Sequence, residues 1–378
     1  MRLIRWWLIL FLILTGALSF GCSDDLAPEP LEPNPEPPHE PADELPSDDP
    51  APDPEEESEE SDESDPNGAP ASPDEPDVGP TSGLLPNELG SVMVLMYHGF
   101  GDADSEWVRS YDGFRSDLEY LYQEGYRPVS LSDYLAGTID LPKGMTPVLL
   151  TFDDGLESQL QWEGNQVGRL ADDTAVKILL DFAEDHPGFE TRGVLYLNSP
   201  RPFYPLPEAD IAPTLQWLVD QGFELGNHTH YHASLRESTD QEVQRAIALT
   251  QALFDEVVPE AEVQSLALPY GLWPEERSLA YRGRYQDLEY AYEAVMLVGA
   301  EPASSPFSRQ FSPRATPRIR ACEEQLPLWF GSMEQNPDRR YVSDGKPDTI
   351  TVPRDKEDAL NLDAVGEREV HFREESGE

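Results

Sequence analysis

Short apolar runs alternate with helical patterns from about residue 92 onward, and this alternation constrains the fold more than any other feature of the chain. Strands are expected at residues 92–97, 148–152, 193–197, 223–225 and 265–268. Helices are expected over residues 114–123, 175–182, 211–219 and 241–257. Strands that alternate with helices form parallel sheets with crossover helices. We therefore expect the α/β class, as a barrel or an open sheet.

Polar residues lie just past the ends of four of the expected strands. These residues are His98, the pair Asp153 and Asp154, His228, and Tyr270. The carboxyl ends of parallel strands meet at one edge of the sheet, where catalytic groups gather in such folds. We expect the four positions to converge on one rim.

Two adjacent aspartates at the end of an apolar strand repel each other unless a positive group holds them. If Asp154 binds a metal ion, Asp153 is left to take a proton from the bound water, whose pKa the cation lowers. Gly155 allows a sharp turn, so that both carboxylates can face one cavity. An ordinary Asp-Asp-Gly turn is the alternative.

Three of the seven histidines of the chain lie within five residues, at positions 228, 230 and 232. In a helical turn His228 and His232 share a face, and His230 points away from it. Two histidines and one carboxylate leave positions open for water and a substrate oxygen, as a catalytic metal site requires. A surface histidine cluster is the alternative.

These residues resemble the polysaccharide deacetylases of the NodB-homology type, carbohydrate esterase family 4. Residues 151–155 (TFDDG) match the first family motif, and residues 228–232 (HTHYH) match the layout of the second. Residues 96–98 (MYH) are similar to the opening of the branch that includes exopolysaccharide deacetylases, whose histidine lies beside the active site. The resemblance covers roughly residues 91–320.

The resemblance implies a distorted (β/α) barrel with a divalent metal at its rim. Asp154, His228 and His232 would be the metal ligands, and Asp153 the general base. Zn²⁺ is the expected metal, with Co²⁺, Ni²⁺ or Fe²⁺ as alternatives.

Two departures from the family pattern concern the acid and the charge beside the base. Ala267 stands where the third motif has an arginine, and the only histidine after the histidine motif is His371. The backbone N–H of Tyr270 can still serve as the oxyanion donor, because that role needs no particular side chain. We take His98 as the candidate acid and Arg318 as the candidate for the missing counter-charge. The alternatives are a structural histidine and a surface salt bridge.

Residues 1–21 are typical of a secretory signal, with two arginines, an apolar run and a small residue at the end. The run is shorter than the about 20 apolar residues that span a bilayer, which makes a transmembrane anchor the weaker alternative. Residues 18–22 (LSFGC) resemble a bacterial lipobox, which implies lipidation of Cys22. We expect an exported lipoprotein anchored at the bacterial cell envelope. Ser23, in place of an aspartate after Cys22, is compatible with delivery to the outer membrane if the organism has one. A cleaved, unlipidated protein is the alternative.

Residues 22–85 are rich in Pro, Glu, Asp and Ser, and the first Lys or Arg after the signal is Arg109. Such a segment is expected to be a disordered, acidic tether. It contributes much of the formal net charge of -48, which argues against a nucleic-acid partner. A catalytic domain is expected over residues 86–331, followed by a polar C-terminal extension over residues 332–378. Cys322 is the only other cysteine and is expected to be buried.

The function expected from these observations is a metal-dependent N-deacetylase of an N-acetylated envelope or extracellular polysaccharide. It would hydrolyse an amide bond and release acetate. Two alternatives stay open: a catalytically weakened glycan-binding lipoprotein, and an amidohydrolase of the same fold that acts on a small amide. The sequence does not predict an oligomeric state.

Overall fold

The computed structural model describes residues 78–299 and 301–374. The expected signal at residues 1–21, the lipidation site Cys22 and the tether up to residue 77 lie outside the described residues. None of the described helices has the length and apolar content needed to cross a bilayer.

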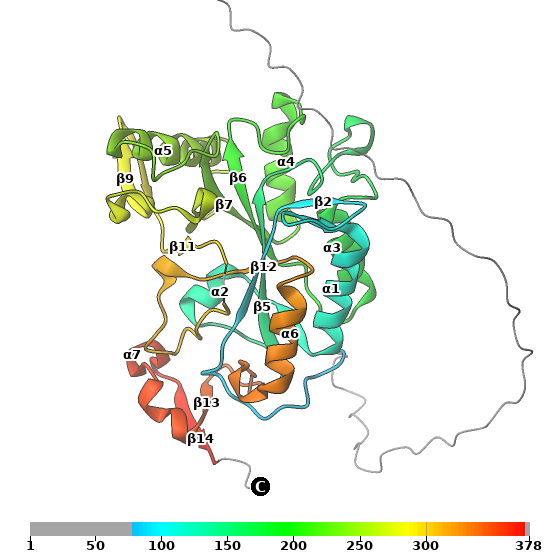
Figure 1. Ribbon diagram of the computed structural model, residues 1–378, viewed down its shortest axis with the longest axis vertical. Helices are drawn as coiled ribbons and strands as arrows, with labels where there is room; N and C mark the ends of the chain where they lie inside the picture. Colours follow the sequence, from blue (N-terminus) through cyan, green and yellow to red (C-terminus); the bar gives the residue numbers. More distant parts are fainter. Residues whose placement is uncertain (1–77, 300, 375–378) are drawn as a thin grey trace, which may run out of the picture. The chain divides into compact units, whose positions relative to one another are not determined.

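A parallel sheet of eight strands forms the centre of the structure (Figure 1). Its order is β11-β8-β7-β6-β5-β1-β12, and β4 pairs with β5 off this path. The strands are β1 (Met93–Tyr97), β4 (Tyr126–Pro128), β5 (Thr146–Asp154), β6 (Gly193–Ser199), β7 (Phe223–His230), β8 (Ser265–Ala267), β11 (Ala294–Met296) and β12 (Ile319–Arg320).

Helices and small strand pairs surround this sheet. The helices are α1 (Tyr111–Gln123), α2 (Leu131–Ala136), α3 (Ala175–Asp185), α4 (Glu208–Asp220), α5 (Asp240–Val257), α6 (Leu326–Gln335) and α7 (Leu362–Val365). The smaller strands pair as β2 (Gly99–Gly101) with β3 (Val108–Ser110), β9 (Arg282–Tyr285) with β10 (Leu288–Ala291), and β13 (Thr349–Pro353) with β14 (Glu369–Arg373).

The sheet curls into a distorted barrel, as expected. One short segment, residues 316–320, connects its two edges. Thr316 forms a bridge with Met296 of β11, and three residues later Ile319 pairs with Leu95 of β1. The barrel is therefore closed by a segment that touches each edge at only a few residues.

Alternate residues of the central strands point into two separate cores. On β5, Val148, Leu150 and Phe152 pack in the cluster that includes the buried residues of α1 and α3, whereas Leu149 packs in the cluster inside the barrel. This period of two follows from strand geometry. It places Asp153, which continues the series of Leu149, on the inner side of the sheet.

The folded chain begins earlier than the predicted boundary at residue 86. Arg127 is buried and donates hydrogen bonds to the carbonyl oxygens of Val78 and Pro80, and the N–H of Ser82 donates to Gly144. A buried guanidinium requires acceptors. The last residues assigned to the tether supply them.

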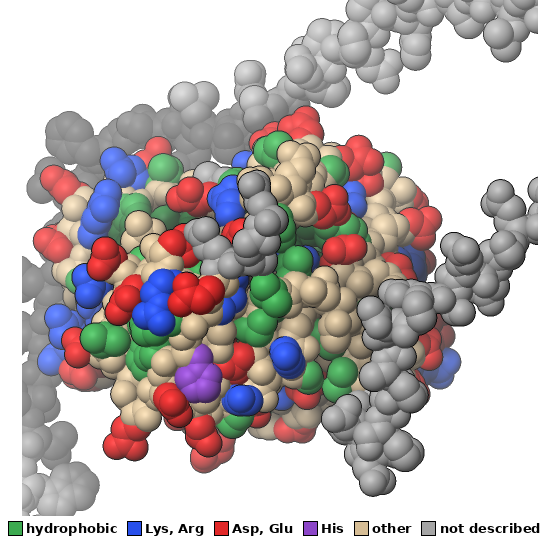
Figure 2. Space-filling view, turned by 90° about the horizontal axis from the view of Figure 1, so that it is seen from below, with side chains coloured by type: hydrophobic (Ala, Val, Ile, Leu, Met, Phe, Trp, Pro, Cys, Tyr) green, Lys and Arg blue, Asp and Glu red, His purple; other side chains and the backbone are tan. Residues whose placement is uncertain are grey.

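The C-terminal extension packs against the start of the domain. The backbones of Asn87 and Val342 exchange two hydrogen bonds, and β13 and β14 form a parallel pair beyond them. Glu88 lies buried beneath this pair, where it accepts a hydrogen bond from the N–H of Thr351 and contacts Tyr341. Burial raises the pKa of Glu88 to about 8. Figure 2 shows the surface on this side, where acidic and basic side chains are interspersed.

The strands and helices predicted from the apolar pattern are all present, with small shifts at their ends. The pattern missed shorter elements such as α2, β9 and β10. Cys322 is buried and unpaired, as expected.

Candidate active site

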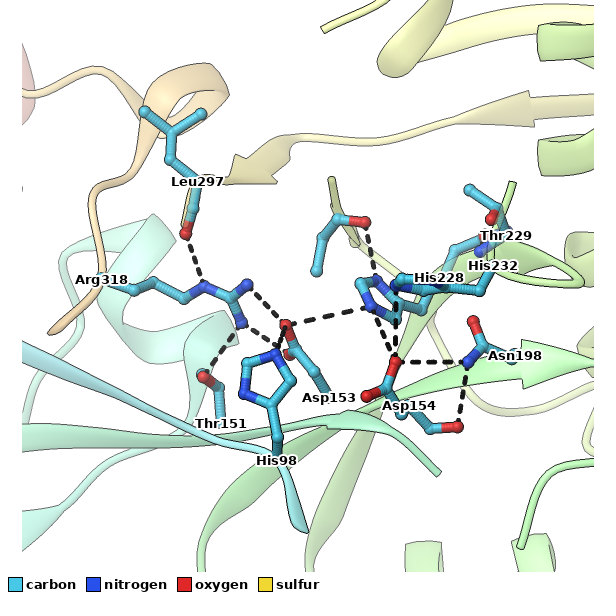
Figure 3. A network of polar contacts seen from close by, with 12 residues as sticks. His98, Thr151, Asp153, Asp154, Asn198, His228, Thr229, His232, Leu297 and Arg318 are labelled. Atoms are coloured by element: carbon cyan, nitrogen blue, oxygen red, sulfur yellow. Dashed lines mark hydrogen bonds and ion pairs between the residues drawn. The ribbon is translucent and has the colours of Figure 1, made fainter. Parts of the chain in front are cut away.

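The carboxyl ends of β1, β5, β7 and β8 meet at one rim, as predicted (Figure 3). His98 follows β1, Asp153 and Asp154 end β5, and His228 lies near the end of β7. Arg318 enters from the closing segment. Figure 3 shows these side chains directed toward one another across the end of the barrel.

Arg318 and Asp153 form a buried, two-pronged ion pair. The Nη1 and Nη2 atoms of Arg318 lie 2.7 Å from Oδ1 and 2.7 Å from Oδ2 of Asp153, and the two side chains are 0% and 1% exposed. Arg318 also donates to the carbonyl oxygen of Leu297 and to the hydroxyl of Thr151. Because the guanidinium is a planar fork, these contacts fix the carboxylate in orientation as well as in charge. The alternative of a surface salt bridge for Arg318 is therefore wrong.

A left-handed turn brings the second aspartate into the same site. Neighbouring residues of a strand point to opposite faces, but Asp154 has φ of 80° and Gly155 has φ of 63°. The turn thus begins at the aspartate itself, one residue earlier than the glycine that suggested it. Asn198, at the end of β6, donates from Nδ2 to the backbone oxygen of Asp154 and holds this conformation.

The histidine motif forms a left-handed turn and not a helix. His228 belongs to β7, and Thr229, Tyr231 and His232 have φ of 71°, 56° and 51°. This left-handed backbone, unusual for residues with a side chain, folds the chain back, so that the rings of His228 and His232 lie 4.8 Å apart. His230 points elsewhere, as predicted, and its Nδ1 lies 2.8 Å from the hydroxyl of Ser199.

Asp154, His228 and His232 form a group that can hold a metal ion. The Nε2 atoms of His228 and His232 lie 3.4 Å and 3.5 Å from Oδ1 of Asp154. Ligands at the about 2.0–2.1 Å bond lengths of a tetrahedral zinc site lie roughly 3.3 Å apart. The spacing fits a divalent metal.

The hydrogen bonding of His228 also supports a metal ion at this position. Its Nδ1 lies 2.9 Å from the carbonyl oxygen of Ala267 and donates to it, so a neutral ring presents an unprotonated Nε2. That Nε2 is buried and makes no hydrogen bond in the described structure. Buried polar atoms normally have a partner, and a metal ion would be one.

The charges of the site shift the pKa values of its groups in different directions. Burial alone would raise the pKa of Asp153, but Arg318 and His228 outweigh it and hold that pKa below its ordinary value. Burial also opposes ionisation of Asp154, yet its contacts with His228 lower its pKa. Burial lowers the pKa of His228, but the charges of Asp153 and Asp154 more than reverse this. The two carboxylates are ionised and favour a cation between them.

The two remaining predicted residues border this cluster. Nε2 of His98 lies 3.9 Å from Oδ2 of Asp153, and burial lowers the pKa of His98. Tyr270 lies in the turn after β8 with φ of 58°, and its ring contacts His232 edge-on at 4.5 Å between centroids. His371, on β14, is paired with Glu369 in the C-terminal strand pair and is not part of the cluster.

Sequence reasoning missed three residues around the site. Gln159 donates from Nε2 to the carbonyl oxygens of both His98 and Asp153 and links the two strand ends. Asn198 directly follows the strand predicted over residues 193–197, and that position could have revealed it. Trp107 contacts the ring of His98, and no sequence signal indicated it.

Residues 196–290 match the family model described as polysaccharide deacetylase. The matched range contains His228, His232 and Tyr270, and the TFDDG motif precedes it. Over this range the chain matches the polysaccharide deacetylase family. No curated protein sequence matches the chain.

Several solved structures are similar to this deacetylase fold. The Streptococcus pyogenes deacetylase PplD in complex with acetate is 16% identical, with 65% of this chain and 98% of that chain covered and a TM-score of 0.47. IcaB from Ammonifex degensii is 19% identical, with 62% and 93% covered and a TM-score of 0.42. The de-N-acetylase from Aggregatibacter actinomycetemcomitans is 14% identical, with 60% and 93% covered and a TM-score of 0.40.

Proposed function

We propose that the protein is a metal-dependent deacetylase that removes N-acetyl groups from an N-acetylated polysaccharide of the cell envelope or its surroundings. The observation that carries this proposal is the juxtaposition of two units. One is the group Asp154, His228 and His232, in which Nε2 of His228 is buried and makes no hydrogen bond. The other is Asp153, held ionised by Arg318.

Asp154, His228 and His232 would hold the metal ion. When bound, a divalent metal polarises the acetamide oxygen and lowers the pKa of water. Zn²⁺ suits a site of two imidazoles and one carboxylate, and Co²⁺, Ni²⁺ or Fe²⁺ are the alternatives.

Asp153 acts as the general base. Its carboxylate is buried, ionised and fixed at both oxygens, so it takes a proton from the attacking water without having to reorient. Addition of hydroxide to the acetamide carbonyl gives a tetrahedral oxyanion. The backbone N–H of Tyr270 is the donor proposed to stabilise it.

His98 carries the proton from Asp153 to the leaving nitrogen. Burial keeps its imidazole neutral at rest, so the proton that it donates is the one that Asp153 took from water. The atoms involved, Oδ2 of Asp153 and Nε2 of His98, lie 3.9 Å apart. Cleavage of the C–N bond then releases acetate and a free amine, and Asp153 is ionised again.

The buried ion pair argues against a weakened glycan-binding protein. Burying Arg318 with Asp153 carries a desolvation penalty that packed apolar side chains would not have. A binding protein has no need of an ionised carboxylate that touches no ligand. No observation favours a small non-sugar amide as substrate.

We also propose export and lipid anchoring through Cys22, which would present the catalytic domain to glycans of the envelope. Support for this comes from the sequence of residues 1–23 alone. Fractionation of cells that express the wild type and Cys22→Ala tests it, since the variant should leave the membrane fraction.

The test of the activity is acetate release from N-acetylglucosamine oligomers, with chelator and then with added Zn²⁺ or Co²⁺. Release that chelation stops and metal restores supports the proposal. Absence of release on several N-acetylated glycans, with metal demonstrably bound, would leave the glycan-binding alternative.

A further inference from the structure

An exposed tryptophan stands beside the catalytic residues. Trp107 directly precedes β3, is 42% exposed, and contacts the ring of His98 at 4.8 Å between centroids. The imidazole of His98 in turn lies 3.9 Å from Asp153. One side chain therefore separates the indole from the proposed base.

The indole is held in place by contacts on several sides. The N–H of Gly99, the residue after His98, donates to the backbone oxygen of Trp107 at 3.0 Å. The guanidinium of Arg320 lies over the indole, 4.0 Å from the ring centroid, and pairs with Glu106 at 2.8 Å.

The loop that carries Trp107 is anchored to the body of the domain. Arg109 binds Asp104 of the same loop at 2.7 Å and the buried Asp117 of α1 at 2.7 Å and 2.9 Å. Asp104 also accepts a hydrogen bond from the hydroxyl of Ser110. A large aromatic side chain that is fixed and yet half open to solvent adds little to folding, because much of its apolar surface is left unburied.

We propose that Trp107 is a stacking platform for one pyranose ring of the glycan, next to the acetamide that is cleaved. Arg320 lies over the indole, and Trp107 stays 42% exposed for contact with a sugar. Sugars of the gluco configuration present C–H groups on a ring face, which suit the electron-rich face of an indole. A hollow of about 440 Å³, lined by Glu106, Arg320 and residues 322–325 among others, lies next to the loop that carries Trp107.

This inference rests on the proposed function and narrows its substrate class. The preferred substrate is an oligomer or polymer of gluco-configured hexosamine, bound through at least one ring besides its acetamide. Trp107 is a binding residue and Arg320 a positioning residue.

The experiment compares kcat/KM on the N-acetylglucosamine pentamer with kcat/KM on the monomer, using the complete protein. In Trp107→Ala this ratio should fall about tenfold or more, since stacking buries much of an indole face. Trp107→Phe should recover part of the ratio. Arg320→Ala should lower it less, and should have no further effect in the Trp107→Ala background.

Trp329→Phe is the matched control, because Trp329 also lies under an arginine but belongs to α6. It should keep the wild-type ratio. A wild-type ratio in Trp107→Ala would overturn the inference.

Direct measurement of glycan binding distinguishes failure of the proposed activity from failure of the stacking platform. If the wild type releases no acetate, the Kd for the N-acetylglucosamine pentamer, measured by titration of the wild type and of Trp107→Ala, tests the inference without any turnover. A Kd raised tenfold in Trp107→Ala supports the platform, and an equal Kd, or no binding by the wild type, overturns it.

Discussion

Removal of the arginine beside the base tests the proposed mechanism most directly. Arg318→Ala leaves the carboxylate of Asp153, 1% exposed, without the two 2.7 Å contacts that hold it. Loss of one partner of a buried ion pair costs about 3–5 kcal/mol. That cost falls on folding; because the base is then neither held ionised nor fixed in place, kcat/KM should also fall, by about 10²- to 10⁴-fold, the usual contribution of a positioned general base.

The same loss predicts a change in the pH profile. Arg318 keeps the pKa of Asp153 low against its burial, so the pKa of Asp153 should rise in Arg318→Ala. The acidic limb of kcat/KM, measured by acetate release, should move to higher pH. Arg318→Lys keeps the positive charge but cannot bind both carboxylate oxygens as the planar guanidinium does. The acidic limb of its kcat/KM profile should lie between those of Arg318→Ala and the wild type.

Two controls separate this effect from unfolding. Arg192→Ala removes an exposed arginine paired with Glu190 and should stay within about threefold of the wild type. In the Asp153→Asn background, Arg318→Ala should lower stability little further, because the carboxylate charge that Arg318 balances is already absent. A folded Arg318→Ala protein with more than a third of wild-type kcat/KM and an unshifted acidic limb would refute the reasoning.

Three further predictions concern the metal, stability and anchoring. Asp153→Asn should abolish turnover and keep near-stoichiometric metal, whereas His228→Ala or His232→Ala should lose both; a metal-free but active His232→Ala protein contradicts the site. The folded state holds the proton of Glu88 up to about pH 8 and the unfolded state releases it near pH 4.3, so the free energy of unfolding should fall as pH rises between these values, by at most about 1.4 kcal/mol per pH unit. Glu88→Gln should remove that slope and raise the melting temperature at pH 8, and an unchanged slope refutes the assignment. Cys22→Ala should release the protein from membranes, and persistent association would indicate an uncleaved anchor.

The sequence predicted the strand ends that deliver the site, because buried parallel strands leave a strong apolar signal. Asp154 and His228 were found this way. It did not predict the backbone of the histidine motif, since a helix and a left-handed turn can both bring residues i and i+4 together. Thr229 and Tyr231 carry no sign of a positive φ, which only their surroundings stabilise.

The pairing of Arg318 with Asp153 was a hypothesis that the apolar pattern could not decide. The two residues are 165 positions apart, and Ile319–Arg320 is too short a strand to register as periodicity. The packing of the C-terminal extension could not be predicted from the apolar pattern for a related reason. It needs only a few buried apolar residues, such as Val342 and Val352, among polar neighbours.

Placing the counter-charge on the closing segment ties catalysis to closure of the barrel. The base is made early in the chain and its arginine late, and the two meet only when residues 316–320 pair with both edges of the sheet. Before that contact forms, the strongest of the influences that offset burial and keep the carboxyl of Asp153 ionised is missing. A nascent or partly opened chain can thus have most of its secondary structure and still be inactive.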